Sequence, residues 1–299
     1  MKNILITGAS GFVGQYFISH YLKKYDIQTF SFLQDSFEKL SLEGVDVVVH
    51  LSALVHQMGG ASADEYEKVN VTQTLELAKK AKASGVKQFV FMSSVKVYGE
   101  ESEVPYTEVT PCRPQDDYGK SKLKAEKELQ KLEDENFVVS IIRTPIVYGY
   151  GVKANIKNLV NLVRKVPVLP FSGIENRRSM IYVGNLCFFI DVIIEKRVSG
   201  IFLVADEKPL STTKLIELIV DALGKRVYLV RVPFFEGLLR VVKPSFHKRL
   251  YGSLEVENQN TLRRLFGKVE TLLPKSSEDE VLLPFSVEDG IRLMIKGEA

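Results

Sequence analysis

The feature that most constrains the fold is an alternation of short β-branched runs with helix-forming segments over the first two-thirds of the 299-residue chain. Such alternation is typical of a parallel sheet with helices on both faces. Residues 45–51 are apolar at nearly every position, as a strand buried on both faces should be. We predict strands at residues 3–7, 27–32, 46–51, 88–93 and 138–143, and a helix at 62–84 that ends before Gly85.

The alternation loosens after about residue 148, where we expect a smaller C-terminal α/β lobe. The predicted domains are residues 1–150 and 151–299, with some later segments returning to the first. A helix is predicted at 155–165 and a polar loop at 275–280. The strongly apolar segment 232–243 (VPFFEGLLRVVK) is predicted to be a helix packed within this lobe. The alternative for this segment is a face that meets a membrane surface or a partner.

Charge and composition exclude several classes of function. Lysine and arginine total 40 against 37 acidic residues, so the net charge is only +3 and nucleic acid is not expected as a partner. Cys112, Cys187 and four histidines show no metal-ligand or disulfide spacing. The apolar run at residues 1–7 is too short for a signal peptide, and no stretch reaches the roughly 18 apolar residues of a membrane helix. We therefore expect a cytoplasmic protein without membrane insertion.

A glycine-rich loop, TGASGFVG (7–14), follows the first predicted strand and precedes a helix pattern at 15–24. Glycines allow a tight turn and let backbone amides approach a pyrophosphate at the helix N-terminus. A glycine triplet also fits an ordinary turn, but the strand before it and the helix after it are the context that a dinucleotide site requires. We therefore predict a Rossmann-type doubly wound parallel sheet that binds NAD or NADP. The cofactor-binding residues predicted in this loop are Gly8, Ser10, Gly11, Phe12, Val13 and Gly14.

The residue that would distinguish NAD from NADP is not evident. A dinucleotide fold usually carries an acid for the NAD ribose, or an arginine for the NADP phosphate, about 20 residues further on. Residues 29–35 (TFSFLQD) offer neither at the usual spot; Asp35 is the nearest acid, and we expect it on the adenine side of the cofactor. The segment before Asp46 is short, which predicts that one strand of the usual half-sheet is missing or merged.

Tyr118 and Lys122, in YGKSK (118–122), are four residues apart and share one face of a predicted helix. A tyrosine pKa near 10 is too high for proton transfer at neutral pH, and a nearby ammonium would lower it. Ser93 and Ser94 follow a predicted strand and can supply a hydroxyl for the substrate oxygen. The alternative is that Tyr118 and Lys122 are only neighbours on a solvated face; the glycine loop and the serine pair favour catalysis.

Together these motifs resemble the extended short-chain dehydrogenase/reductase family, in particular its nucleotide-sugar epimerase and reductase branch. The resemblance runs from residue 1 to about 267 and includes HLSA (50–53), SSVKVYG (93–99), RTPIVYGYGVKAN (143–155) and RRSMIYVGNL (177–186). It implies Ser94, Tyr118 and Lys122 as the catalytic triad, with Tyr118 and Lys122 also contacting the cofactor. The other residues that it implies are Leu51, Ser52 and Ala53 for the cofactor, and Ser94, Val95, Asn155, Arg178 and Arg249 for the substrate.

The resemblance also assigns individual roles around the substrate. Arg178 is implied to meet the sugar-nucleotide diphosphate. Arg177 and Arg249 are weaker candidates for the same group, with a solvated surface role as the alternative. His56 is a further candidate for facing the substrate, although a lone histidine is more often structural.

Departures from the family pattern narrow the chemistry. Sugar 4,6-dehydratases of this family carry an Asp-Glu pair where this chain has Val95 and Lys96, so dehydratase activity is disfavoured. The commonest 4-epimerases carry an asparagine in an Arg-Tyr-Phe-Asn run, whereas residues 143–146 read RTPI. This difference and the short adenosine region favour a 4-keto-sugar reductase, against the larger number of family members that are epimerases.

The resemblance thus implies an NAD(P)-dependent enzyme that transfers a hydride at C4 of a UDP-linked sugar, as a reductase or an epimerase, in surface-polysaccharide or sugar-nucleotide metabolism. The alternative is a non-catalytic NAD(P)-binding regulatory or scaffold protein. It is disfavoured because the chain keeps Ser94, Tyr118 and Lys122. A homodimer through the Tyr118 helix is expected by analogy with the fold alone.

Overall fold

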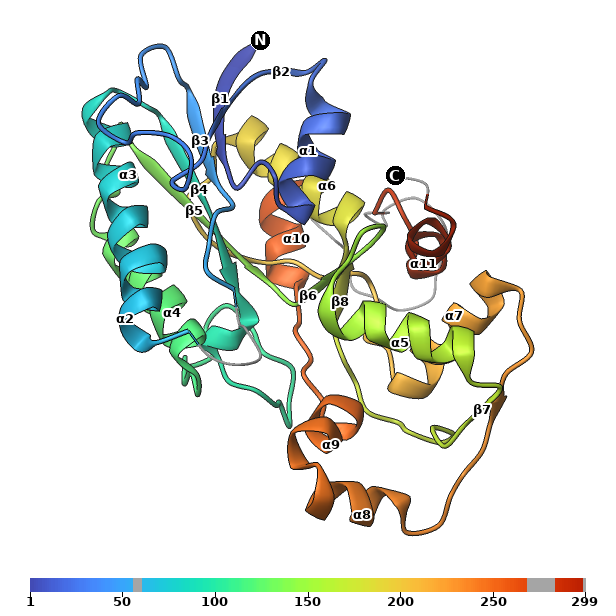
Figure 1. Cartoon of the computed structure of the whole chain (residues 1–299). Helices are drawn as coiled ribbons and strands as arrows, with labels where there is room; N and C mark the ends of the chain where they lie inside the picture. The colour runs from blue at the N-terminus through green and yellow to red at the C-terminus, as the bar shows by residue number, and fades with distance from the viewer. Residues whose placement is uncertain (56–60, 268–282, 298–299) are drawn as a thin grey trace.

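A six-stranded parallel sheet forms the centre of the molecule (Figure 1). The computed structural model describes residues 1–55, 61–267 and 283–297. The strand order is β2-β1-β3-β4-β5-β9, which confirms the predicted α/β class. The strands are β1 (Lys2–Thr7), β2 (Tyr25–Phe30), β3 (Val47–His50), β4 (Gln88–Ser94), β5 (Val138–Thr144) and β9 (Gly200–Leu203). All five predicted strands are present within two residues of their expected bounds.

Helices cover both faces of this sheet, because successive side chains of each strand point to opposite sides. Ile4 and Ile6 of β1 pack in a cluster with Phe17 of α1 (Phe12–Tyr21) and with α6 (Val183–Lys196). Leu5 points the other way, into a cluster with Leu77 of α3 (Gln73–Ala83) and with α4 (Asp117–Gln130). Figure 1 shows the same arrangement, with α3 and α4 on one side of the sheet and α1 and α6 on the other.

The adenosine side of the sheet is shortened, as predicted. In the described part of the chain β2 is the edge strand, and residues 31–46 between β2 and β3 contain no strand. The chain turns directly after β2, where the Asp35 carboxylate accepts a hydrogen bond from the Ser31 backbone amide at 2.8 Å. This bond closes the turn, so the expected role of Asp35 on the adenine side of the cofactor remains a prediction.

The predicted helix at 62–84 is present in three consecutive parts: α2 (Ala63–Tyr66), a π-helical segment (Glu67–Thr72) and α3. Ser62 begins it with a capping box, in which its hydroxyl accepts from the Glu65 amide and the Glu65 carboxylate accepts from the Ser62 amide. π-Helical turns inside α-helices are frequent at functional sites. The buried residues of this segment are Asn70 and Val71, of which Asn70 is polar.

The later part of the chain builds a second lobe and also returns to the first. β6 (Ile146–Tyr148) pairs with β8 (Met180–Tyr182), and β7 (Val168–Leu169) pairs with β10 (Tyr228–Leu229). The helices of this part are α5 (Ala154–Lys165), α7 (Thr212–Leu223), α8 (Phe235–Val242), α9 (Pro244–Tyr251), α10 (Gln259–Phe266) and α11 (Val287–Lys296). α6 and β9 return to the central sheet, while the domain boundary near residue 150 remains a prediction. The predicted loop at 275–280 lies outside the described residues.

The prediction for the apolar segment 232–243, a helix packed within the lobe, is confirmed only in part. The segment does form a helix, α8, but α8 contains no buried residue. Only Phe235 and Leu239 pack against the core, while Leu238, Val241 and Val242 are exposed. The apolar pattern of α8 therefore exceeds what the fold buries. No helix in the described ranges is long and apolar enough to cross a membrane.

Candidate active site

The three predicted catalytic residues come from two neighbouring elements. Ser94 is the last residue of β4, and its hydroxyl accepts a hydrogen bond from the Lys96 amide at 3.3 Å, which begins a short 3-10 turn (Val95–Val97). Tyr118 and Lys122 lie on α4, whose N-terminus is capped by the Asp116 carboxylate on the Gly119 amide at 2.7 Å. The strand end and the capped helix thus bring the serine and the tyrosine together.

Tyr118 has a strongly perturbed pKa. Its ring is partly accessible from the cleft, but protein surrounds it closely, and this burial raises the pKa of Tyr118 to about 12. A hydrogen bond with the Ser94 hydroxyl acts in the opposite direction and lowers the pKa. The two hydroxyls are therefore near enough to hold one substrate oxygen between them.

The structure shows how Lys122 is held, while its expected effect on the pKa of Tyr118 remains a prediction. Lys122 is only 2% exposed, and its ammonium donates to the Met92 carbonyl oxygen at 2.8 Å and lies 4.5 Å from the centre of the Phe91 ring. Burial lowers the pKa of Lys122 to about 7, against a raising influence of Glu126. The contact with the Ser94 hydroxyl lowers the pKa of Tyr118, while the Lys122 ammonium is held by the strand beside it.

A buried ion pair lies beneath the triad and was not predicted. Glu126, one helical turn after Lys122, is 1% exposed and pairs with Arg143 of β5, which is 3% exposed. The Arg143 Nη2 atom lies 2.5 Å from Glu126 Oε2, and Nη1 donates to the Tyr98 hydroxyl at 2.6 Å. Ser93 also donates to Glu126. The pair ties β4, α4 and β5 together beside the three predicted catalytic residues.

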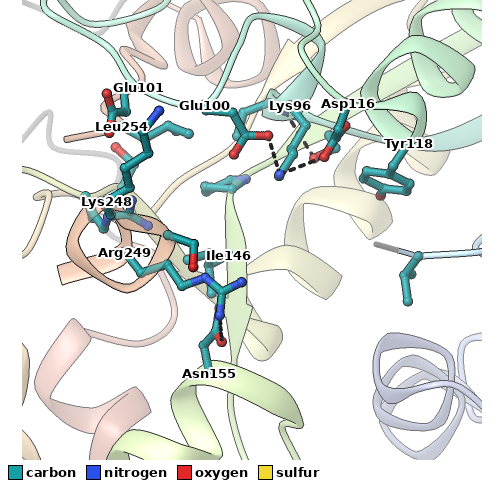
Figure 2. Close-up of a pocket in the computed structure, with 17 residues that line it drawn as sticks. Lys96, Glu100, Glu101, Asp116, Tyr118, Ile146, Asn155, Lys248, Arg249 and Leu254 are labelled. Carbon is teal, nitrogen blue, oxygen red and sulfur yellow. Dashed lines mark hydrogen bonds and ion pairs between the residues drawn. The ribbon is translucent and has the colours of Figure 1, made fainter. Parts of the chain in front are cut away.

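A cleft of about 630 Å³ opens above Ser94 and Tyr118. Val95, Asn155, Arg178 and Arg249 also line this cleft, so the structure brings together all five residues predicted for substrate binding. Figure 2 shows Tyr118 on one side of the cleft, with Asn155 and Arg249 on the other. Sequence spacing alone does not relate these five positions, because they lie in β4, the 3-10 turn after it, the segment before β8, α5 and α9.

The three arginines that were candidates for a diphosphate have different environments. Arg178 donates from Nε to the Gly252 carbonyl at 2.9 Å and still lines the cleft. Arg249 contacts Asn155 across 3.5 Å and lines the same cleft. Arg177 instead forms a surface ion pair with Glu255 at 2.5 Å. The surface alternative therefore holds for Arg177, while Arg178 and Arg249 remain candidates for the diphosphate.

Five charged residues that line the cleft were not predicted as site residues: Lys96, Glu100, Glu101, Asp116 and Lys248. The Lys96 ammonium reaches into it and is held between Glu100 at 2.5 Å and Asp116 at 2.9 Å (Figure 2). Burial lowers the pKa of Lys96, but the two carboxylates more than offset this and raise it. The sequence did contain a sign that Lys96 lies in the cleft, because it follows Ser94 by two residues at the carboxyl end of a strand. This residue was considered only as the replacement for a dehydratase carboxylate.

The glycine loop fits a dinucleotide. Gly8 has φ +71° and lies so near the end of β3 that a Cβ there would be 2.8 Å from the Ser52 amide nitrogen. A Cβ on Gly14 would collide with the Gly8 carbonyl and lie 2.9 Å from the Ala9 Cα. α1 begins at Phe12, so the amides of its first turn have no partner within the helix and point to the loop. The tight loop and helix N-terminus form the cradle that a pyrophosphate requires.

The predicted cofactor residues outside this loop lie beside it. The Ser52 amide donates to the Thr7 hydroxyl at 3.3 Å, which holds Leu51, Ser52 and Ala53 against the end of β1. Asn70 of the π-helical segment accepts from the Leu54 amide at 2.8 Å and donates to the Ser121 hydroxyl of α4 at 3.0 Å. It therefore connects the cofactor side with the catalytic helix, a role that the sequence did not reveal. Ser10 and Val13 lie in the loop and the first turn of α1, while His56 lies outside the described residues.

Two residues of the motif RRSMIYVGNL (177–186), Tyr182 and Asn185, hold a buried carboxylate in place. Asp206, just beyond β9, is buried and accepts hydrogen bonds from Tyr148 at 2.8 Å and Asn185 at 2.8 Å. Burial raises the pKa of Asp206 to about 6, against the lowering effect of these donors. These contacts fix β6, β8 and α6 relative to β9. They set the position of β8, which follows the cleft residue Arg178.

The dinucleotide cradle, the Ser94–Tyr118 contact and the adjoining cleft define a nucleotide-cofactor enzyme of the short-chain dehydrogenase type. The ranges that the structure describes contain no group of three or more His, Cys, Asp or Glu placed to hold a metal ion. The family model for the NAD dependent epimerase/dehydratase family matches residues 4–205. The chain belongs to this family, which confirms the expected family and class of enzyme.

Comparisons with known proteins add three relatives. A UDP-glucose 4-epimerase from Vibrio cholerae is 36% identical and aligns with 89% of this chain and 90% of its own. An N-acetyl-α-D-glucosaminyl-diphospho-ditrans,octacis-undecaprenol 4-epimerase from Escherichia coli O157:H7 is 28% identical over 79% of this chain and 77% of its own. The structure of a UDP-glucuronic acid 4-epimerase from Bacillus cereus in complex with NAD is similar at a TM-score of 0.76, with 18% identity, over 98% of this chain and 97% of that one. This last likeness concerns the fold.

Proposed function

We propose that this enzyme epimerises a UDP-linked hexose at C4, with NAD as its cofactor. The observation that carries the proposal is the contact between Ser94 and Tyr118 at the base of a cleft that also holds Arg178 and Arg249. The relative from V. cholerae, named a UDP-glucose 4-epimerase, supports both the reaction and the nucleotide. Departures in the sequence favoured a reductase, but the names of the relatives favour an epimerase.

The chain's own residues divide the work between proton transfer and positioning. A bound nicotinamide supplies the hydride acceptor and donor for C4. Tyr118 exchanges a proton with the C4 oxygen, and Ser94 donates a hydrogen bond to the same oxygen. Arg178 and Arg249 hold the diphosphate, and this binding energy positions C4 near the tyrosine. Lys122 lies beneath the cofactor side, where its ammonium orders the strand end at Met92.

Dehydration is not part of this proposal. At the positions of the dehydratase acid and base, Val95 is buried and Lys96 is an ammonium paired with two carboxylates. Glu100 and Asp116 do line the cleft, but each is engaged with Lys96. Positions 95 and 96 therefore carry no carboxylate that could act as the acid or base of a dehydration.

The first experiment is to denature the purified protein and assay the cofactor that it releases. An epimerase recycles its cofactor without letting go, so stoichiometric NAD and interconversion of UDP-glucose and UDP-galactose are expected. An empty site, together with consumption of reduced cofactor when a 4-keto UDP-sugar is supplied, would establish a reductase instead. Tyr118→Phe should abolish turnover and leave NAD binding nearly intact. Activity within tenfold of the parent would refute the role of the tyrosine.

A second candidate substrate is a sugar carried on a polyprenol diphosphate. The E. coli relative is named for such a substrate. The observation that favours it is a second cavity of about 430 Å³, lined by apolar residues of α5, α7 and α9, which shares Asn155, Arg178 and Arg249 with the catalytic cleft. Parallel assays with UDP-N-acetylglucosamine and with the polyprenyl diphosphate of the same sugar would decide between the carriers. The cytoplasmic location and the homodimer remain predictions.

A further inference from the structure

The segment from Val230 to Tyr251 projects from the C-terminal lobe and exposes an unusual amount of apolar surface. It consists of α8, α9 and the chain that leads into them, and we call it the α8–α9 arm. Figure 1 shows α8 at the edge of the molecule, farther from the central sheet than α9. Its exposed apolar side chains are Val230, Val232, Phe234, Leu238, Val241, Val242 and Phe246.

α8 has two apolar faces, and the fold uses only one. Phe235 and Leu239 are four residues apart and pack inward, with the Phe235 ring 6.2 Å from that of Phe171. Leu238 and Val241 of α8 are three residues apart and are 60% and 81% exposed. Phe234, directly before the helix, is 93% exposed. Contacts within the chain thus account for the first face and leave the second unexplained.

The backbone adds a cost to this exposure. Phe234 has φ +61°, a left-handed conformation that is unfavourable for a bulky residue that is not glycine. This conformation precedes α8 and accompanies the most exposed phenylalanine of the arm. A left-handed backbone that presents a 93% exposed ring points to a contact outside the chain.

The charges around the exposed face show what kind of surface would meet it. Residues 230–251 contain five lysines and arginines and one acid, although the whole chain is nearly balanced at +3. Arg231, Arg240 and Lys243 are exposed beside the apolar side chains. The single acid, Glu236, lies 3.2 Å from Arg240 and is partly neutralised by it. The arm therefore combines an apolar face with a cationic border.

We propose that the α8–α9 arm binds the surface of an anionic lipid bilayer. An amphipathic helix with aliphatic and phenylalanine side chains on one face and arginine and lysine at its border lies in the interface between headgroups and acyl chains. A second copy of the chain fits less well, because pairing two arms would bring their basic residues together. A membrane surface was one of the two alternatives that the sequence left open for residues 232–243, and the exposed apolar face with its basic border favours it.

Docking of the arm has a consequence for the active site. Ser245, Lys248 and Arg249 of α9 line the catalytic cleft, so the same helix borders both the cleft and the exposed face of the arm. A bilayer bound by α8 would therefore lie near the cleft. Binding of α8 to a bilayer does not depend on which sugar carrier the enzyme uses. It can therefore be tested apart from the proposed epimerase activity.

The test is co-sedimentation of the full-length protein with vesicles. We expect binding to phosphatidylglycerol-rich vesicles, weaker binding to pure phosphatidylcholine, and loss of binding at high salt. Leu238→Glu with Val241→Glu should lower the apparent partition coefficient at least about tenfold. Arg231→Gln and Lys243→Gln should each lower it by about fivefold on the anionic vesicles.

The matched control is Val104→Glu with Val109→Glu, which makes the same change at two exposed valines outside the arm. This control should bind like the parent. Both double variants should keep the parent's epimerase activity on a soluble UDP-sugar, which shows that they fold and separates this test from that of the proposed function. The proposal is refuted if the parent does not sediment with the anionic vesicles, or if the arm variant sediments equally well. It is also refuted if the arm substitutions instead convert a dimer to a monomer in analytical ultracentrifugation.

Discussion

Replacing Glu126 by glutamine should destabilise the protein strongly, because it leaves Arg143 charged and unpaired in the interior. Both side chains are almost fully buried, at 1% and 3% exposure. In the parent the Arg143 Nε atom lies 3.1 Å and 3.2 Å from the two Glu126 oxygens, and Nη2 lies 2.5 Å from one of them. Glutamine keeps the shape and some hydrogen bonds but removes the countercharge.

The expected magnitude follows from the burial of both partners. Removing one partner of a buried ion pair costs about 3–5 kcal/mol, since the remaining charge has been taken out of water without compensation. At about 2–4 °C per kcal/mol for a chain somewhat smaller than this one, the melting temperature should fall by roughly 6–20 °C. A surface pair such as Lys131–Glu128 gives the contrast, because exposed pairs contribute about 0–1 kcal/mol.

The assay is urea unfolding followed by circular dichroism, with thermal melts as a second readout. Glu126→Gln is compared with Glu128→Gln as the exposed control and with the double variant Glu126→Met/Arg143→Met. The double variant removes both charges, so it should be more stable than the sum of the single losses predicts, with a coupling of about 1–3 kcal/mol. If Glu126→Gln lies within 1 kcal/mol of the parent, the argument from buried charge is refuted.

Three further predictions concern the site. Gly14→Ala should weaken NAD binding at least about tenfold in a fluorescence titration, since its Cβ would displace the Gly8 carbonyl from the cofactor loop; unchanged affinity would contradict this. In the ligand-free protein, the folded-state pKa of Lys122 near 7 lies below the unfolded value of 10.5. The unfolded chain therefore binds the extra proton between these values, and stability should rise with pH in that window. Relative to Lys122→Met, the parent should gain about 2 kcal/mol between pH 7 and pH 9 in urea unfolding, whereas a constant difference would contradict the lowered pKa. Arg178→Met should raise KM for the UDP-sugar at least about tenfold and leave NAD affinity unchanged; an equal loss of NAD binding would instead indicate a structural role for Arg178.

The elements predicted well are those that local pattern dictates. The buried strand at β3 and the glycine loop at residues 7–14 depend on short runs whose residue types suit only a few backbone conformations. The helix that carries Tyr118 and Lys122 has a capping acid and an apolar face within one short stretch. The shortened adenosine side was also predictable, because too few residues separate β2 from β3 for another strand and its crossover helix.

Long-range geometry was not predictable in the same way. The lowering of the Tyr118 pKa was assigned to Lys122, and only the fold shows that the ammonium turns to the Met92 carbonyl. The part of Lys96 in the cleft and the buried pair of Glu126 with Arg143 depend on segments that meet only in three dimensions. The amphipathic pattern of α8 predicted an apolar contact but not whether the chain itself supplies it.

The sequence by itself determined the parallel sheet and the tight glycine loop, because each depends on residues near one another in the chain. It also predicted Ser94, Tyr118 and Lys122 as the catalytic set. The tertiary structure decided how β4, α4, α5 and α9 surround one cleft, and how burial sets the charge states of Tyr118 and Lys122. It also decided that the second face of α8 stays outside the core. The physical reason is that desolvation and packing depend on neighbours distant in sequence, whereas backbone conformation and helix capping depend mainly on adjacent residues.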